Sequence, residues 1–189
     1  MALSGSNGAG KTTLLKLISG YLEPDCGIIE IAGVPLSTWQ KKAFREKISA
    51  VFQDELIISG TIRDNITLKN RKYTKQELED ALHLSGADSL VRRMPEGLEH
   101  RIGLDGGGLS GGERQKVAIA RALIRQPDIL IFDEVTNHLD YESRCMVKNL
   151  LNTLRGRTTV LIVSHDPEIL SLCDEILNLP EPSGTESGN

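Results

Sequence analysis

The stretch GSNGAGKT, Gly5 to Thr12, lies close to the start of the chain and decides its fold class. It matches the pattern G-x-x-x-x-G-K-[ST], in which glycines let backbone N–H groups turn inward around phosphate oxygens. The apolar residues before it and the helical pattern after it predict a strand, a loop and a helix, whose N-terminal dipole favours anions. We therefore predict a phosphate-binding loop; the alternative is a glycine-rich turn without a ligand.

Each residue of this loop is a candidate for binding the phosphates of ATP. Lys11 can reach the β- and γ-phosphates, and the Thr12 hydroxyl can ligate Mg²⁺. The residues that we expect to bind the nucleotide here are Gly5, Ser6, Asn7, Gly8, Ala9, Gly10, Lys11, Thr12 and Thr13. A nucleotide and Mg²⁺ are therefore the expected ligands of this loop.

A second motif, DILIFDE from Asp128 to Glu134, ends an apolar run with two carboxylates. Asp133 suits the role of holding the Mg²⁺ shell, often through water. Glu134 could polarise a water molecule toward the γ-phosphate. By itself an Asp–Glu pair is usually a strand-end turn, but the phosphate-binding loop earlier in the chain favours the functional interpretation.

Composition excludes several classes of protein. The chain has 189 residues, which is enough for one domain with a real core, and 39% of them are hydrophobic. The net charge of −4 offers no basic field, so we expect no nucleic-acid partner. Cys26, Cys145 and Cys173 are far apart and odd in number, which fits neither a disulfide framework nor a metal site.

Apolar runs alternate with helical patterns along the chain, which predicts an α/β fold with a mostly parallel sheet. We expect strands over residues 2–4, 27–33, 48–52, 128–133, 159–164 and 175–179. From about Thr61 to Leu104 the pattern is helical and more polar, which indicates a helical subdomain inserted between two halves of the sheet. The prediction is one P-loop NTPase domain over 1–179, with its core in 1–53 and 126–179, the helical subdomain in about 54–125, and a disordered tail in 180–189.

The stretch LSGGERQKVAIARAL, Leu109 to Leu123, is the most informative one. Ser110 and Glu113 have the spacing of a capping box, which is the plain interpretation. Gly111 and Gly112 would weaken the first turn, so they make more sense if backbone and the Ser110 hydroxyl approach an anion closely. Two phosphate-binding helix ends in one domain suggest that they serve different nucleotides, or one nucleotide between two copies.

Taken in order, the P-loop, LSGGE, ILIFDE, NHLD and VSHD resemble the motifs of an ATP-binding cassette (ABC) ATPase domain. The resemblance runs from Gly5 to about Leu179. It implies Mg-dependent ATP hydrolysis. It also implies head-to-tail pairing with a second ABC ATPase domain, identical or different, in which each ATP lies between the P-loop of one domain and Ser110, Gly111, Gly112 and Glu113 of the other.

The resemblance also implies roles for residues that the chemistry alone does not single out. Gln53 in VFQDE falls at the glutamine that touches Mg²⁺ and the attacking water in this family. His165 falls at the histidine that contacts the γ-phosphate, although a lone histidine after a strand is more often structural. Asn137 to Asp140 would lie at the dimer seam, with Asp140 near the nucleotide.

Two stretches resemble export-type members of the family. ISGTIRDNI, residues 58–66, is similar to the segment that follows the family's glutamine, and residues 97–113 are similar to the approach to LSGGE. The resemblance implies a transmembrane domain as partner and a place on the cytoplasmic face of the membrane. TNHLD, residues 136–140, is frequent instead in soluble ribosome-associated ABC proteins. Half of such a protein is therefore one alternative, and an inactive truncated fragment is another.

Residues 56–66, LIISGTIRDNI, are the expected docking surface for that transmembrane domain. Ile57 and Ile58 are neighbours before Gly60, so we expect an exposed apolar pair. Thr61 and Asp64 have the spacing of a helix cap.

The base of the nucleotide has no evident platform in this sequence. Family members normally begin with two further strands and an aromatic residue that stacks on adenine. The sequence has no aromatic residue before Tyr21, so we expect an N-terminally incomplete domain with weak discrimination between ATP and GTP, unless Tyr21 supplies the platform.

Overall fold

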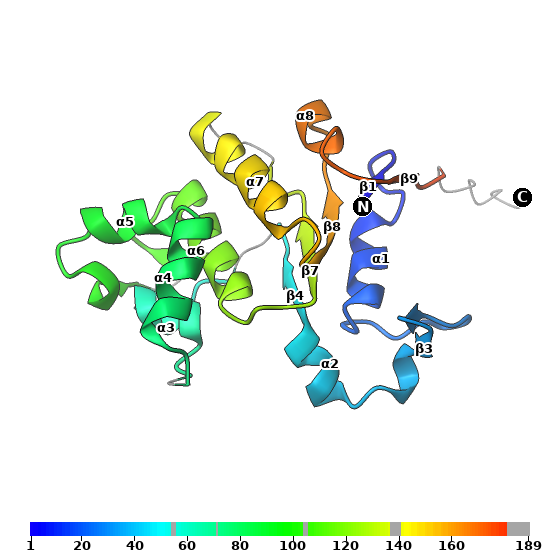
Figure 1. Cartoon of the computed structure of the whole chain (residues 1–189), viewed down its shortest axis with the longest axis horizontal. Coiled ribbons are helices and arrows are strands. Elements are labelled where there is room, and N and C mark those ends of the chain that lie inside the picture. Colours follow the sequence, from blue (N-terminus) through cyan, green and yellow to red (C-terminus); the bar gives the residue numbers. More distant parts are fainter. Residues whose placement is uncertain (54–55, 71, 104–105, 137–140, 181–189) are drawn as a thin grey trace, which may run out of the picture.

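A five-stranded parallel sheet forms the centre of the molecule in the computed structural model (Figure 1). The structure describes residues 1–53, 56–70, 72–103, 106–136 and 141–180. The strand order is β4-β7-β8-β1-β9, and the strands are β1 (Ala2–Ser4), β4 (Ile48–Val51), β7 (Ile129–Asp133), β8 (Thr159–Val163) and β9 (Ile176–Asn178). The predicted α/β class with a mostly parallel sheet is confirmed.

Strand β7 is buried on both faces, as a central parallel strand should be. Leu130, Ile131 and Phe132 are each 0% exposed. Ile131 belongs to the cluster that contains Leu3 and Val163, whereas its neighbours belong to the larger cluster on the other face. Successive side chains therefore point to two separate cores.

Helices cover both faces of the sheet. Helix α1 (Lys11–Ile18) and helix α2 (Lys41–Lys47) bury Leu15 and Phe44 in the smaller core. Helix α7 (Tyr141–Leu154) buries Val147 and Leu150 in the larger one and contacts β8, after which the short helix α8 (Pro167–Leu170) follows.

The expected strand over residues 27–33 is wrong in extent and in partner. Only β2 (Glu30–Ile31) is extended, and it pairs antiparallel with β3 (Val34–Pro35) as a hairpin separate from the main sheet. Ala32 and Gly33 have φ angles of 52° and 75°, the left-handed conformations of a two-residue hairpin turn. The turn therefore reverses the chain where the pattern predicts a longer strand. A short 3₁₀ helix (Leu36–Thr38) leads from the hairpin to α2.

The remaining helices gather beside the β4 edge of the sheet, on the opposite side from α1 (Figure 1). They are α3 (Ile62–Thr67), α4 (Lys75–Leu84), α5 (Ala87–Arg93) and α6 (Gly111–Leu123). Helix α6 contacts α3, α4, α5 and β4. A two-stranded hairpin of β5 (Gly60–Thr61) and β6 (Arg101–Ile102), with a 3₁₀ helix at Gly97–Glu99, completes this group, which we call the helical half. The boundaries predicted for a helical subdomain remain a prediction.

Reciprocal capping boxes begin three helices of the helical half. The predicted Thr61–Asp64 box is confirmed at α3, and the Ser110–Glu113 box is formed at α6. Thr74 and Glu77 cap α4 in the same way. Each box satisfies two backbone N–H groups that a helix start would otherwise leave without a partner. Within the described residues, none of the helices has the length and apolar character needed to cross a bilayer.

Candidate functional site

The carboxyl edge of the parallel sheet collects the predicted nucleotide-binding and catalytic residues. The P-loop follows β1, Glu134 follows β7, and His165 follows β8 by two positions. Gln53 follows β4 by two positions and is exposed. Neighbouring strands are about 4.8 Å apart, so groups at the same end of β1, β8 and β7 border one shared surface.

Glycine conformations shape the P-loop. Gly8 and Gly10 have φ angles of 85° and 87°, in the region that side chains disfavour. A Cβ atom at Gly5 would lie 3.0 Å from the carbonyl oxygen of Leu179 in the chain that follows β9. Gly5 therefore permits close packing against the C-terminal segment, while Gly8 and Gly10 permit the turn itself.

Lys11 is the buried cation of the loop. The side chain is only 6% exposed, and its Nζ atom donates to the carbonyl oxygens of Gly5 and Ser6, each at 2.9 Å. An ammonium group has three N–H donors, so one more can be donated to a phosphate oxygen. The backbone of the P-loop therefore surrounds the Lys11 ammonium group at the N-terminus of α1.

Asp133 is a buried carboxylate with spare acceptor capacity. It is 2% exposed, and its Oδ1 atom has no hydrogen-bond partner within the described part of the chain. Burial raises the pKa of Asp133 above its ordinary value, although the hydrogen bond from the Thr12 side chain lowers it. Thr12 and Asp133 thus bring two hard oxygen ligands together, which is a donor set that fits Mg²⁺.

Glu134 occupies a strained backbone position. Its φ angle is 55°, a left-handed conformation that costs a non-glycine residue about 1–2 kcal/mol. The backbone N–H of Glu134 donates to the Val163 carbonyl at 3.1 Å, and the next carbonyl, that of Val135, accepts from the Gln115 side chain of α6. Bonds from β8 and α6 therefore hold the strained turn in place, which is common where a residue has a functional orientation.

Ser164 fixes the backbone around His165. Ser164 is fully buried, its hydroxyl lies 2.9 Å from that of Thr136, and it accepts from the Asp166 N–H at 3.1 Å. His165 itself is exposed at the same edge of the sheet. The structure thus places His165, Glu134 and the P-loop on one edge, while the role given to each remains a prediction.

Ser110 and its neighbours lie with the helical half rather than with the P-loop. Strand β4, which borders this half, is separated from β1 by β7 and β8. Three strand spacings amount to about 14 Å. Ser110, Gly111, Gly112 and Glu113 therefore do not adjoin the P-loop of their own chain. The predicted seam residues 137–140, Asp140 included, lie outside the described residues.

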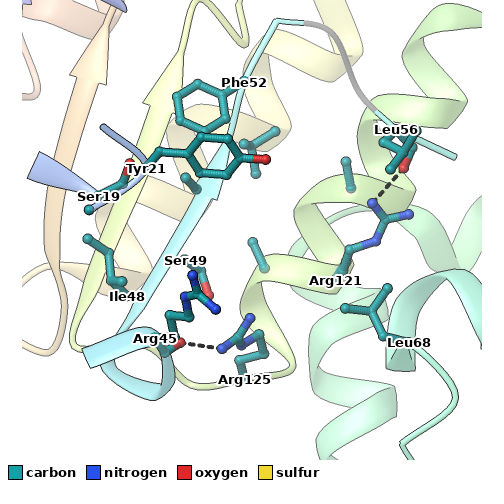
Figure 2. A pocket seen from close by; sticks show the side chains of 15 residues that line it. Ser19, Tyr21, Arg45, Ile48, Ser49, Phe52, Leu56, Leu68, Arg121 and Arg125 are labelled. Atoms are coloured by element: carbon teal, nitrogen blue, oxygen red, sulfur yellow. Dashed lines mark hydrogen bonds between the residues drawn. The ribbon is translucent and has the colours of Figure 1, made fainter. Parts of the chain in front are cut away.

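A groove between β4 and α6 is a feature that the sequence does not predict (Figure 2). It has a volume of about 540 Å³, and Arg45, Arg121 and Arg125 line it together with aromatic and aliphatic side chains. Tyr21 and Phe52 meet edge to face there, with ring centroids 6.2 Å apart. We call it the arginine groove.

Tyr21 is badly placed for stacking on a base at the P-loop. It follows the C-terminal end of α1, whereas the P-loop precedes the N-terminal end. Eight helical residues span about 12 Å. Tyr21 therefore belongs to the arginine groove, and the suggestion that it replaces an adenine platform is not supported.

The expected exposed pair Ile57 and Ile58 is wrong. Ile57 is 3% exposed and belongs to the larger core, while Ile58 is half-buried. Leu56 is the exposed residue, at 70%, and it lines the arginine groove. The chain satisfies the backbone of Ile58 through a buried asparagine, Asn65, and so turns Ile57 inward.

Comparison with known proteins gives one consistent result. The sequence profile of the family described as "ABC transporter" matches residues 1–137. The chain is 37% identical over 188 residues to the ATP-dependent lipid A-core flippase of Xylella fastidiosa, covering 99% of the chain and 32% of the relative. It is 39% identical over 190 residues to a multidrug resistance ABC transporter ATP-binding and permease protein of Lactococcus lactis, covering 100% and 32%.

A solved structure agrees with these relatives. The structure of a bacterial Atm1-family ABC exporter with ATP bound superposes with a TM-score of 0.88 at 31% identity, covering 95% of the chain and 31% of that protein. The chain spans about a third of the length of the relatives that it matches.

Proposed function

Because this chain belongs to the ABC transporter family, we propose that it is the part of an exporter that binds and hydrolyses Mg-ATP. The observation that carries the proposal is that the buried Lys11 of the P-loop and the buried carboxylate of Asp133, which bonds the Thr12 side chain, lie at the same edge of the sheet. A cation for phosphate and two oxygen ligands for a divalent ion then lie at one edge of the sheet. The solved structure that the chain resembles is of an ABC exporter, and the similar sequences are a lipid A-core flippase and a multidrug resistance ABC transporter.

Each functional residue at this edge of the sheet has its own role in the proposed reaction. The P-loop N–H groups and Lys11 bind the β- and γ-phosphates, and Thr12 and Asp133 hold the metal ion. Mg²⁺, when bound, neutralises charge on the two phosphates. His165 contacts the γ-phosphate from β8, and Gln53, after β4, would touch Mg²⁺ and the attacking water.

Glu134 is the proposed general base. Its carboxylate accepts a proton from a water molecule whose oxygen bonds to the γ-phosphorus. The bond from that phosphorus to the bridging oxygen of ADP breaks, so ADP and inorganic phosphate leave. The strained turn supports this role because hydrogen bonds from β8 and α6 fix the backbone at Glu134 and Val135.

A second copy, or a related domain, completes the site in this proposal. Ser110 and the glycines after it offer a capped helix start that lies away from the P-loop of the same chain. Head-to-tail pairing would place this helix start against the γ-phosphate bound by the other domain.

The arginine groove is the proposed docking site for a short helix of the transmembrane domain. Leu56 is exposed at its rim, and three arginines line it, so the fitting occupant carries an apolar side chain and at least one carboxylate. The chain would then lie on the cytoplasmic face of the membrane. The soluble ribosome-associated alternative rests on TNHLD, whose residues 137–140 lie outside the described residues.

Substitution of Glu134 by Gln tests the proposed chemistry. The change keeps the shape of the side chain and removes the base, so steady-state ATP hydrolysis should fall by roughly 10²–10⁴-fold. ATP affinity in the presence of Mg²⁺ should stay near that of the parent. If the Gln variant hydrolyses ATP at the parent rate, another group is the base.

A further inference from the structure

Arg121 joins helix α6, which begins after Ser110, to the segment that follows Gln53. Its Nη1 atom donates to the Leu56 carbonyl at 2.6 Å, and its Nε atom donates to the Asn65 carbonyl at 2.7 Å. Nη2 lies 3.2 Å from the Asn65 side-chain oxygen. Figure 2 shows the Arg121 guanidinium reaching from α6 to Leu56 on one side of the arginine groove.

Asn65 completes the connection from the other side. The residue is 0% exposed, and its Oδ1 atom accepts from the Ile58 N–H at 2.9 Å. Its Nδ2 atom donates to the carbonyls of Ile58 and Thr61 at 2.9 and 3.0 Å. Both donors and the acceptor of this buried amide are therefore used, and a fully satisfied buried network of this kind is rigid.

These bonds join parts of the chain that are far apart in sequence. Leu56 and Asn65 lie 65 and 56 positions before Arg121. Almost all of the bonds end on backbone atoms, so they fix the path of residues 56–61 rather than the conformation of individual side chains. Leu56 is only three positions after Gln53, and Ser110 begins the helix that carries Arg121.

We propose that Arg121 and Asn65 are a positioning pair that fastens residues 56–61 to α6, so that the segment after Gln53 and the helix that presents Ser110 move as one body. The inference rests on the proposed function, because it is the docking of a partner at Leu56 that the pair would transmit to α6. Without the pair, the segment could shift in the groove while the helix start stays in place. Arg121 acts through Gln53 and Ser110 and touches no nucleotide itself.

Hydrogen exchange in the complete chain tests the fastening directly. In the Arg121→Met variant the Ile58 amide and its neighbours in residues 56–61 should exchange at least roughly tenfold faster than in the parent. In the parent this segment must break the bonds to Arg121 before it opens, and in the variant those bonds are absent. Amides of β8 should exchange at the parent rate. Arg121→Lys retains the charge and one donor for the Leu56 carbonyl, so it should give intermediate rates.

The kinetic consequence distinguishes positioning from mere stability. Arg121→Met should lower kcat for ATP hydrolysis by about tenfold and leave KM within about twofold, because the nucleotide contacts are intact and only their alignment is lost. Arg121→Lys should recover part of kcat. Arg92→Met, on α5, is the matched control: Arg92 pairs with Asp88 on its own helix, and its loss should change neither exchange in residues 56–61 nor kcat.

The remaining outcomes either support or overturn the proposed positioning pair of Arg121 and Asn65. Parent-like exchange at residues 56–61 in Arg121→Met overturns the inference, as does an equal kcat loss in Arg92→Met. If Arg121→Met also loses protection in β8, Arg121→Lys decides: faster exchange confined to residues 56–61 supports the pair, and unchanged exchange there overturns it. A parent chain that hydrolyses no ATP would contradict the proposed function, while the exchange comparison would still test the fastening.

Discussion

The carboxyl edge of the sheet, which carries the P-loop, Asp133 and Glu134 and which we call the phosphate edge, differs from the helical half in the environment of its carboxylates. Asp133, at the end of β7, is buried with an oxygen that lacks a hydrogen-bond partner in the described residues, and burial raises its pKa. Asp64, at the start of α3, accepts the Thr61 N–H at 3.1 Å, and this bond lowers its pKa. The first carboxylate destabilises the fold when ionised and suits a cation, whereas the second stabilises the fold when ionised.

The same contrast holds for the surrounding structure. Strained positions and a buried lysine lie at the phosphate edge, where Glu134 has a left-handed backbone and Lys11 is held inside a loop. The helical half has satisfied capping boxes and the buried network around Asn65. Left-handed non-glycine residues are not confined to the phosphate edge, because Leu68 and Lys69 at the end of α3 have φ angles of 50° and 60°. The two regions differ in hydrogen bonding: the capping boxes and Asn65 have partners for their polar groups, whereas an oxygen of Asp133 has none among the described residues.

Residue Ile57 gives the largest expected change in stability. Ile57→Ser removes a 3% exposed side chain from the larger core, which should lower the free energy of unfolding by roughly 2–4 kcal/mol. Leu56→Ser, at the neighbouring exposed position, is the matched control and should leave the melting temperature close to that of the parent. Equal destabilisation by the two changes would contradict the assignment of Ile57 to the core and of Leu56 to the exposed rim of the groove.

Asp133 should give a smaller effect of the opposite sign. Because its pKa is raised in the folded chain, the neutral form favours folding, and that stability is present at low pH and lost as the pH rises through the raised pKa. Without nucleotide or Mg²⁺, Asp133→Asn should therefore raise the melting temperature at neutral pH by roughly 2–6 °C. The gain should shrink as the pH falls toward the ordinary value of 3.8. A fall in melting temperature at neutral pH would contradict this description of the phosphate edge.

Asp64 should give the smallest effect, and its pH dependence is reversed. Its lowered pKa means that the ionised form favours folding, so its contribution is present above the ordinary pKa and lost as the pH falls through the lowered one. Thermal melts of Asp64→Asn should show a slight loss of stability at neutral pH that vanishes in acid. The difference in melting temperature from the parent should change with pH in opposite directions for Asp64→Asn and Asp133→Asn. A change in the same direction for both would contradict the opposite roles of the two carboxylates.

Local sequence predicts the strand, loop and helix of the P-loop and the cap of α3 well, because their geometry is local. The glycines and Lys11 of the P-loop, the apolar run before Asp133 and the Thr61–Asp64 cap each depend on a few adjacent residues. The Ile57 side chain could not be predicted, because its direction depends on Asn65 and on Arg121, which is 65 positions after Leu56. The 27–33 strand failed because Ala32 adopts a left-handed conformation that its side chain does not favour.

The arginine groove has the same explanation as Ile57. Arg45 and Arg125 come from α2 and from just beyond α6, and only the fold brings them together around Phe52. Helices α2 and α7 are not among the elements that the apolar pattern predicts. The signal that could find the groove is the pair of arginines four positions apart, Arg121 near the end of α6 and Arg125 just beyond it, on either side of the buried Ala122, Leu123 and Ile124.

Calorimetric titration with Mg-ATP, carried out on the parent chain and on Lys11→Ala, tests whether the P-loop edge of the sheet is the nucleotide site. Removal of the ammonium group deletes charge-assisted bonds worth about 1.5–3 kcal/mol, so the variant should bind roughly 10- to 100-fold more weakly. Thermal melts without nucleotide would confirm that the variant is folded. Equal Mg-ATP affinity for the folded variant and the parent would contradict the assignment of this edge as the nucleotide site.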